Sequence, residues 1–156
     1  KELKSDFSKL IFFCRTDIST KDVIGHLSKR LILTKKEKKH LKDIHLNRMF
    51  IREISIIGNL NYLLSYYSKE ECFVFVEHAY SQGFINNEEL KHLRDYIDNI
   101  TPTKFPVSGN DLLSLGFSPS KALSNILKEL RILWASNDYK TSKKELLDFA
   151  ASKESQ

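Results

Sequence analysis

The chain has 156 residues, of which 41% are hydrophobic and 17 are aromatic (10 Phe, 6 Tyr and 1 Trp), so it can bury a core and is not disordered throughout. Only 5 Gly and 3 Pro, with long runs of Lys, Glu and Leu, favour helices over a turn-rich β fold and predict an all-α protein. No apolar run approaches the length of a membrane span and no leader precedes a cleavage site, which predicts a soluble, cytoplasmic protein with no membrane partner.

The net charge of +5 is unevenly distributed along the chain. Residues 1–50 hold 13 Lys and Arg against 6 Asp and Glu, residues 51–100 hold 4 against 8, and residues 101–156 hold 8 against 6. A polyanion is therefore expected to prefer the two ends of the chain to its middle.

The first 50 residues are predicted to be helical. Apolar spacing indicates two helices within residues 1–33. Thr34 and Glu37 then form a capping box before a third helix, KKEKKHLKDI, which has the densest positive charge in the chain. Its first two turns supply candidate phosphate contacts, with an ordinary solvated helix face as the alternative. These candidates are Lys35, Lys36, Lys38 and Lys39.

Residues 48–57 and 60–67 are apolar enough to be buried helices, and we expect a break between them at Gly58 and Asn59. Aromatic side chains beside a basic groove can stack on unpaired bases. Here they belong to the acidic third of the chain, so core packing is the favoured interpretation. It applies to Tyr62, Tyr66 and Tyr67.

Two more capping boxes, Ser68 with Glu71 and Asn86 with Glu89, predict the next two helices. The first precedes CFVFVEHAYSQ, for which a buried strand over CFVFV is the competing prediction. Pro102 and Pro106 then break the pattern. We therefore expect a helical body over residues 1–100, with or without the end of a neck region, and a helical tail domain over 101–156.

The tail is predicted to begin with a tight pair of helices. Ser108 and Asp111 form a capping box, Gly116 suits a left-handed helix end, and Ser118 with Pro119 is expected to start the second helix. Apolar residues spaced by three and four then predict one core face on that helix. This face consists of Ala122, Leu123, Ile126, Leu127, Leu130, Leu133 and Trp134.

A basic stripe follows the edge of this predicted core face. It consists of Lys121, Ser124, Lys128 and Arg131, whereas Glu129 falls on the opposite flank. A row of cations can follow a phosphate backbone with little regard for base identity. The alternative is a solvated helix face with ordinary charges.

Ser142 and Glu145 are expected to cap a last helix, and ASKESQ to fray at its end. No DxD pair, Walker loop, GxGxxG, GxSxG or HExxH is present. Cys14 and Cys72 are isolated, which predicts two reduced core thiols and no metal site. We therefore expect no catalysis by these 156 residues alone.

FPVSGNDLLSLGFSP, followed by a helix that ends in a Trp and by TSKKELL, resembles the tail of class II CCA-adding enzymes, a family that includes bacterial poly(A) polymerases. RLILTKKEKKHL is similar to the body of these enzymes, but more weakly. Ser120 and Ser124 stand where the family usually has Gly, and Asn137 stands where Gly usually follows the Trp. We expect Asn137 to adopt the left-handed conformation in place of that Gly.

The resemblance implies a C-terminal fragment of a nucleotidyltransferase, in agreement with a chain that begins without Met. Mg²⁺ and ATP or CTP would bind an upstream catalytic head and neck, which would be a partner of this region, and no cofactor would bind here. The body and tail would hold the acceptor and TΨC side of tRNA by backbone contacts. The expected RNA contacts are the basic stripe, then Lys140, Lys143 and Lys144, and then the Lys35 to Lys39 cluster. The alternative is a helical protein-interaction module with no RNA role.

Overall fold

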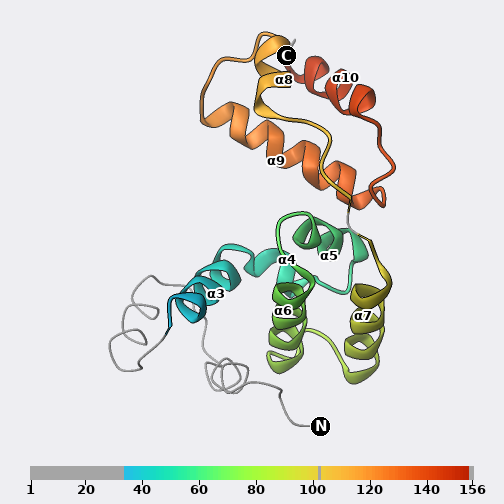
Figure 1. Ribbon diagram of the computed structural model, residues 1–156. Coiled ribbons are helices and arrows are strands. Elements are labelled where there is room, and N and C mark those ends of the chain that lie inside the picture. The colour runs from blue at the N-terminus through green and yellow to red at the C-terminus, as the bar shows by residue number, and fades with distance from the viewer. Residues whose placement is uncertain (1–33, 102, 155–156) are drawn as a thin grey trace. The chain divides into compact units, whose positions relative to one another are not determined.

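The computed structural model describes residues 34–101 and 103–154, and in these residues the chain forms eight helices and no strand (Figure 1). The predicted all-α fold is confirmed. None of the helices described is long and apolar enough to cross a bilayer. The two helices expected within residues 1–33, together with Cys14, lie outside the described residues. The helices are α3 (Lys35–Leu46), α4 (Arg48–Arg52), α5 (Ile57–Leu64), α6 (Lys69–Ser81), α7 (Asn87–Asn99), α8 (Gly109–Ser114), α9 (Lys121–Ser136) and α10 (Lys143–Glu154).

These helices form two compact units that divide the chain in an interleaved way. The first unit takes in the described residues up to Ser55 together with Tyr67–Ile100. The second takes in Ile56–Tyr66 together with the described residues from Thr101 onwards. Helix α5 thus packs with the C-terminal helices, although the sequence analysis placed it in the body; the division into body and tail domains stays a prediction.

Local capping chemistry starts five of the helices where it was predicted. In each box the side chain of the capping residue accepts a hydrogen bond from a backbone N–H in the first turn, and an acidic side chain accepts one from the backbone N–H of the cap. Each such cap stabilises a helix by about 1 kcal/mol. The boxes are Thr34 with Glu37, Ser68 with Glu71, Asn86 with Glu89, Ser108 with Asp111 and Ser142 with Glu145.

The predicted break at Gly58 and Asn59 is wrong. Helix α4 ends at Arg52, and Gly58 lies in the first turn of α5. A Cβ at Gly58 would come within 3.1 Å of the Cα of Ser136 on α9, which is closer than side chains normally approach a backbone. Glycine at this position therefore permits the close approach of α5 and α9 and does not end a helix.

Replacing Gly58 with alanine is expected to lower the free energy of unfolding by about 1–2 kcal/mol. Overpacking against Ser136 costs about 1–3 kcal/mol, and the better helix propensity of alanine offsets part of it. Urea unfolding measures the effect. Gly109→Ala is the matched control, because a Cβ there would meet Leu123 at an ordinary 3.8 Å. Equal stabilities of the two variants would contradict the close approach.

The first unit is centred on α6 and α7, which lie side by side (Figure 1). The helix predicted over CFVFV is confirmed, and Cys72 is a buried free thiol as predicted. Arg94 pairs with Glu77 at 2.7 Å across the two helices, and the ammonium of Lys69 donates to the carbonyl of Asp98. The buried side chains include Leu41, Ile44, Ile51, Phe75, Val76, Leu93 and Ile97.

Trp134 lies at the centre of the second unit's core. It packs against Phe105 and Tyr139, with ring centroids 5.3 and 4.6 Å away. The predicted core face of α9 is wrong at its margins, because Ala122 is exposed and the side chain of Leu133 is 37% exposed. The face that packs is therefore narrower than the apolar pattern indicated. The core consists of Phe105, Val107, Leu112, Leu130, Trp134, Leu146 and Ala150.

The ends of the last two helices differ from the predictions in detail. Gly116 has the left-handed conformation that was predicted, with φ of 101°. Helix α9, however, begins at Lys121 with Ser120 as its cap and without a side-chain capping bond, so the predicted start at Ser118 and Pro119 is wrong. Helix α10 continues to Glu154, so residues 151–154 are helical where fraying was predicted.

The turn after α9 uses two left-handed residues, and neither is Asn137. Asn137 has φ of −101°, whereas Asp138 and Tyr139 have φ of 50° and 62°, so the prediction for Asn137 is wrong. The buried Asn61 of α5 holds this turn. Its side-chain amide donates to the carbonyl of Ala135 and the carboxylate of Asp138, both at 3.3 Å, and its backbone carbonyl accepts from the Tyr139 hydroxyl at 2.8 Å. These bonds offset the conformational cost of the turn.

Candidate nucleic-acid interface

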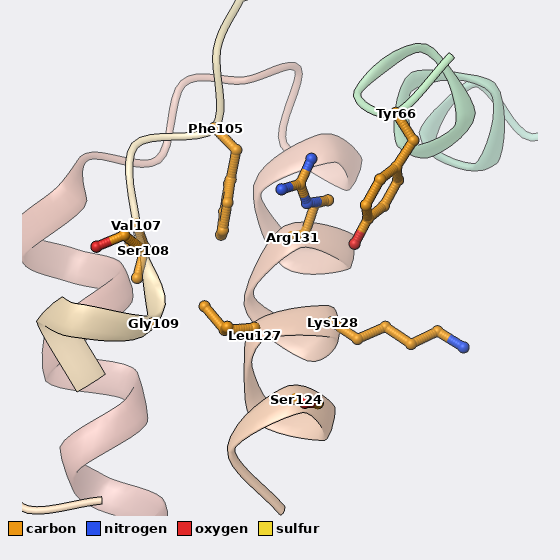
Figure 2. Close-up of a pocket in the computed structure, with 9 residues that line it drawn as sticks. All are labelled: Tyr66, Phe105, Val107, Ser108, Gly109, Ser124, Leu127, Lys128 and Arg131. Carbon is orange, nitrogen blue, oxygen red and sulfur yellow. The ribbon is translucent and has the colours of Figure 1, made fainter. Parts of the chain in front are cut away.

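Three members of the basic stripe line one pocket of the second unit. Ser124, Lys128 and Arg131 lie on one side of α9, as the helical period requires (Figure 2). Lys121 is exposed one turn earlier and does not line the pocket. The pocket has a volume of about 320 Å³, and its lining residues include two cations and no carboxylate. Its other walls are Tyr66, Phe105, Val107, Ser108, Gly109 and Leu127.

Arg131 is held in place from three sides. Its guanidinium lies 3.9 Å from the ring centroid of Tyr66 and 4.5 Å from that of Phe105, and Figure 2 shows it between the two rings. It also donates to the carbonyl of Ser65 at 2.8 Å. A planar guanidinium suits such stacking, and it has five N–H donors, so one bond to a carbonyl does not exhaust it. Arg131 is therefore a structural link between α9 and the end of α5, and not an ordinary solvated charge.

The aromatic walls of the pocket were missed by the sequence analysis. Tyr62 is buried as predicted, but the side chain of Tyr66 is 52% exposed, so its assignment to the core is wrong. Charge counted by thirds of the chain placed Tyr66 in an acidic region, whereas in the structure it lies beside Lys128 and Arg131. No local pattern could have found this, because Tyr66 and Arg131 are far apart in the sequence.

The predicted contacts at the start of α10 are partly engaged within the protein. The ammonium of Lys143 lies 2.7 Å from the carboxylate of Asp111 on α8. This bond, followed by those from Ser108, lowers the pKa of Asp111 to about 2. Lys140 is a looser, exposed partner of Asp138 at 3.8 Å, and Lys144 is exposed. Lys143 therefore ties α10 to α8, and its charge is largely offset there.

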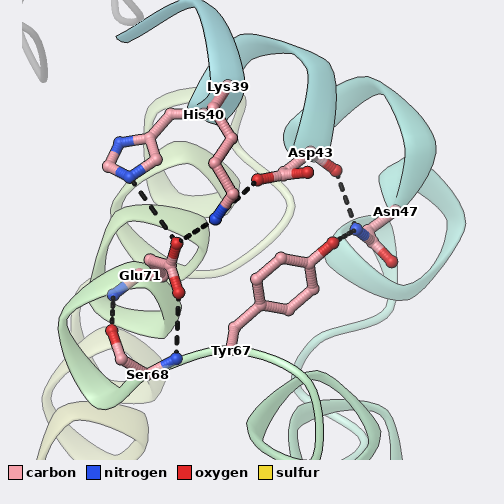
Figure 3. A network of polar contacts seen from close by, with 7 residues as sticks. All are labelled: Lys39, His40, Asp43, Asn47, Tyr67, Ser68 and Glu71. Atoms are coloured by element: carbon pink, nitrogen blue, oxygen red, sulfur yellow. Dashed lines mark hydrogen bonds and ion pairs between the residues drawn. The ribbon is translucent and has the colours of Figure 1, made fainter. Parts of the chain in front are cut away.

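The lysine cluster on α3 belongs to the first unit, whereas the basic stripe belongs to the second. Lys35, Lys36 and Lys38 are exposed. Lys39 differs from them, because its ammonium lies 2.6 Å from Glu71 on α6 and 3.6 Å from Asp43 (Figure 3). The bond to Glu71 raises the pKa of Lys39 and lowers that of Glu71.

Glu71 and Asn47 fix α3 and its C-cap against the start of α6. Glu71 serves both the Lys39 ion pair and the capping box with Ser68 (Figure 3). The side-chain amide of Asn47 donates to the Tyr67 hydroxyl and to the carbonyl of Asp43, both at 2.8 Å. This polar network is structural. All four lysines predicted as contacts on α3 are exposed, and the network pairs the ammonium of Lys39 with Glu71 and Asp43.

Within the described part of the chain, no three His, Cys, Asp or Glu side chains are placed to hold a metal ion. The arrangement of the second unit offers cations, hydroxyls and aromatic rings around one hollow. Such a set of groups can bind a phosphate or another anion, and it can pack against a flat ring.

No protein-family model and no solved structure matches the chain. Over 44 residues it is 50% identical to the CCA tRNA nucleotidyltransferase 1, mitochondrial, of Danio rerio. The matched stretch covers 28% of this chain and 10% of that protein. It indicates a relation between this chain and tRNA nucleotidyltransferases, and it spans about a tenth of that relative's length.

Proposed function

We propose that this chain is the C-terminal, tRNA-binding part of a tRNA nucleotidyltransferase or poly(A) polymerase of class II. The observation that best supports the proposal is the 50% identity over 44 residues to a CCA tRNA nucleotidyltransferase. The tail resemblance over residues 105–147 points to the same class of enzyme. A catalytic domain outside these 156 residues would bind Mg²⁺ and ATP or CTP and would add nucleotides to the RNA 3′ end.

The role of the described helices in this proposal is to hold the acceptor and TΨC side of tRNA. A-form RNA hides its base edges in a deep, narrow major groove, so the contacts are to phosphates and sugars. Lys121, Ser124 and Lys128 are exposed and present one ammonium or hydroxyl per turn along α9 for this purpose. Arg131, the last member of the stripe, lines the pocket between the rings of Tyr66 and Phe105, so we expect Lys121, Ser124 and Lys128 to make the contacts with the duplex. Exposed lysines elsewhere are secondary contacts: Lys35, Lys36, Lys38, Lys140 and Lys144.

A second candidate function is a helical protein-interaction module. Exposed apolar side chains favour it, and they include Leu46, Met49 and Ile56. Apolar association changes little with salt, whereas binding to a polyanion weakens steeply as salt rises. The response of binding to salt therefore separates the two functions.

Reversing two charges on the stripe is expected to weaken tRNA binding by about ten-fold or more. In Lys121→Glu with Lys128→Glu, both side chains are exposed, so we expect the fold to be kept and the loss of affinity to be electrostatic. Each lost phosphate contact also reduces the slope of log affinity against log salt by about 1. Fluorescence anisotropy with labelled tRNA at two salt concentrations measures both quantities.

The matched control is Arg52→Glu with Lys91→Glu, which makes the same change of charge at two exposed positions outside the stripe. Its salt slope should equal that of the unmodified chain. Arg131 is left intact in both variants, because its replacement would also break the contacts with Tyr66 and Ser65. Binding that is insensitive to salt, or equal in the two double variants, would contradict the proposal.

A further inference from the structure

Contacts between α9 and an RNA backbone do not explain one feature of the pocket, which is its aromatic wall. Tyr66 is half-exposed, whereas Tyr62, Leu63 and Leu64 shortly before it are buried, and its ring lies over Arg131. An exposed lysine and a hydroxyl would suffice to bind a phosphate. An exposed ring beside them adds a surface on which a flat apolar group can pack.

The walls of the pocket have two different chemistries. Ser124, Lys128 and Arg131 are polar or cationic and follow one side of α9 over about 10 Å, at 1.5 Å per residue. Tyr66 and Leu127 provide apolar and aromatic surface next to them. A nucleotide has the same two parts, a phosphate and a flat base. RNA-binding proteins bind unpaired bases on aromatic side chains and on guanidinium planes.

The size of the pocket favours a single nucleotide. Its volume of about 320 Å³ lies at the small end of the range for small-molecule sites. A duplex cannot enter a hollow of this size, whereas one unpaired residue of a loop or an end can. Arg131 is already fixed between two rings and a carbonyl, so binding need not order that side chain.

We propose that this pocket binds one unpaired nucleotide of the RNA, with its phosphate at Lys128, Ser124 and Arg131 and its base against the exposed part of the Tyr66 ring. The inference rests on the proposed function and adds to it, because duplex recognition by backbone contacts needs no such pocket. The occupant is a nucleotide within an RNA strand, and a free nucleotide is a separate outcome of the test.

The direct test is an NMR titration of the ¹⁵N-labelled chain with three probes: AMP, a short single-stranded oligoadenylate, and a blunt RNA duplex with no unpaired residue. The single strand is expected to shift the backbone amides of Ser124 and Lys128 and the Nε–H of Arg131, and the duplex is expected to leave the Nε–H unchanged. Equal shifts with duplex and single strand would overturn the inference. Shifts with AMP but not with the single strand would overturn the assignment to RNA and identify a free nucleotide.

A pair of variants tests the aromatic wall. Tyr66→Ala removes the ring and is expected to weaken binding of the oligoadenylate about ten-fold, because stacking of one base accounts for about 5- to 150-fold in affinity. Tyr66→Phe keeps the ring and should bind like the unmodified chain. If Tyr66→Ala proves unfolded by circular dichroism, Lys128→Ala replaces it, with the same loss expected for the oligoadenylate and a smaller loss for the duplex.

The failure of this inference differs from the failure of the proposed function. If the unmodified chain binds tRNA with a steep salt dependence but Tyr66→Ala does so equally well and the Nε–H of Arg131 does not move, only the nucleotide pocket is wrong. If the unmodified chain does not bind tRNA at all, the proposed function is wrong and the RNA assignment of the pocket is overturned with it.

Discussion

Replacing Trp134 with alanine is expected to lower the free energy of unfolding of the second unit by about 3–5 kcal/mol. The side chain is 2% exposed and packs between the rings of Phe105 and Tyr139. Its removal leaves a large cavity in the middle of the core that α8, α9 and α10 share. Small domains are stable by only about 5–15 kcal/mol, so this loss is a large fraction of the total. Urea unfolding followed by circular dichroism measures it.

Leu133→Ala is the matched control for this substitution. Leu133 is the neighbouring residue on α9, is also apolar, and was predicted from the sequence to share the same core face. Because its side chain is 37% exposed, we expect a loss of about 1 kcal/mol or less. Similar losses in the two variants would show that the core is centred elsewhere.

The second large effect is a loss of stability in acid that depends on His78. This side chain on α6 is 9% exposed, and burial lowers its pKa from the ordinary 6.5 to about 4. The unfolded chain therefore binds a proton at this residue between pH 6.5 and pH 4, where the folded chain does not. The contribution of neutral His78 to the free energy of unfolding is complete above pH 6.5 and is lost as the pH is lowered towards 4. At 1.36 kcal/mol per unit of pKa, the loss is about 3 kcal/mol.

Urea unfolding at pH 7 and pH 4 tests this expectation. The unmodified chain should lose about 3 kcal/mol more than His78→Gln between the two pH values, since glutamine does not titrate. His92→Gln is the matched control, because His92 lies exposed on the neighbouring α7 and its replacement should leave the acid sensitivity unchanged. If His78→Gln loses as much stability in acid as the unmodified chain, His78 is not the group responsible.

Five of the helix starts were predictable because the interactions that define them are local. Each of the five capping boxes joins residues three positions apart, so sequence spacing alone determines whether the two bonds can form. Gly116 was predictable for a similar reason, because its left-handed conformation follows from the absence of a Cβ. The all-α fold follows from the same local signals repeated along the chain.

The pocket could not be predicted, because it depends on contacts between distant parts of the sequence. The bond from Arg131 to the carbonyl of Ser65 joins residues 66 positions apart. The helical period of α9 correctly placed Ser124, Lys128 and Arg131 on one face, but it does not indicate what faces them. The charge count by thirds of the chain assigned Tyr66 to the acidic middle third, whereas in the fold it lies beside Lys128 and Arg131.

The left-handed turn after α9 was mispredicted for the same kind of reason. A rule based on conformational preference selects Asn137, since Asn tolerates positive φ better than Tyr. The buried Asn61 instead bonds to Asp138 and Tyr139 and stabilises both in that conformation. Tertiary contacts outweigh the local preference here.

The pairing of α5 with α9 also determines when the second unit can fold during synthesis. Asn61 and its partner Ala135 are 74 residues apart, so at about 5–20 residues per second the ribosome adds the partner about 4–15 s later. During this interval α5 lacks the helix that packs against it at Gly58 and Asn61. The face of α5 that packs on α9 is therefore covered only after α9 has left the exit tunnel.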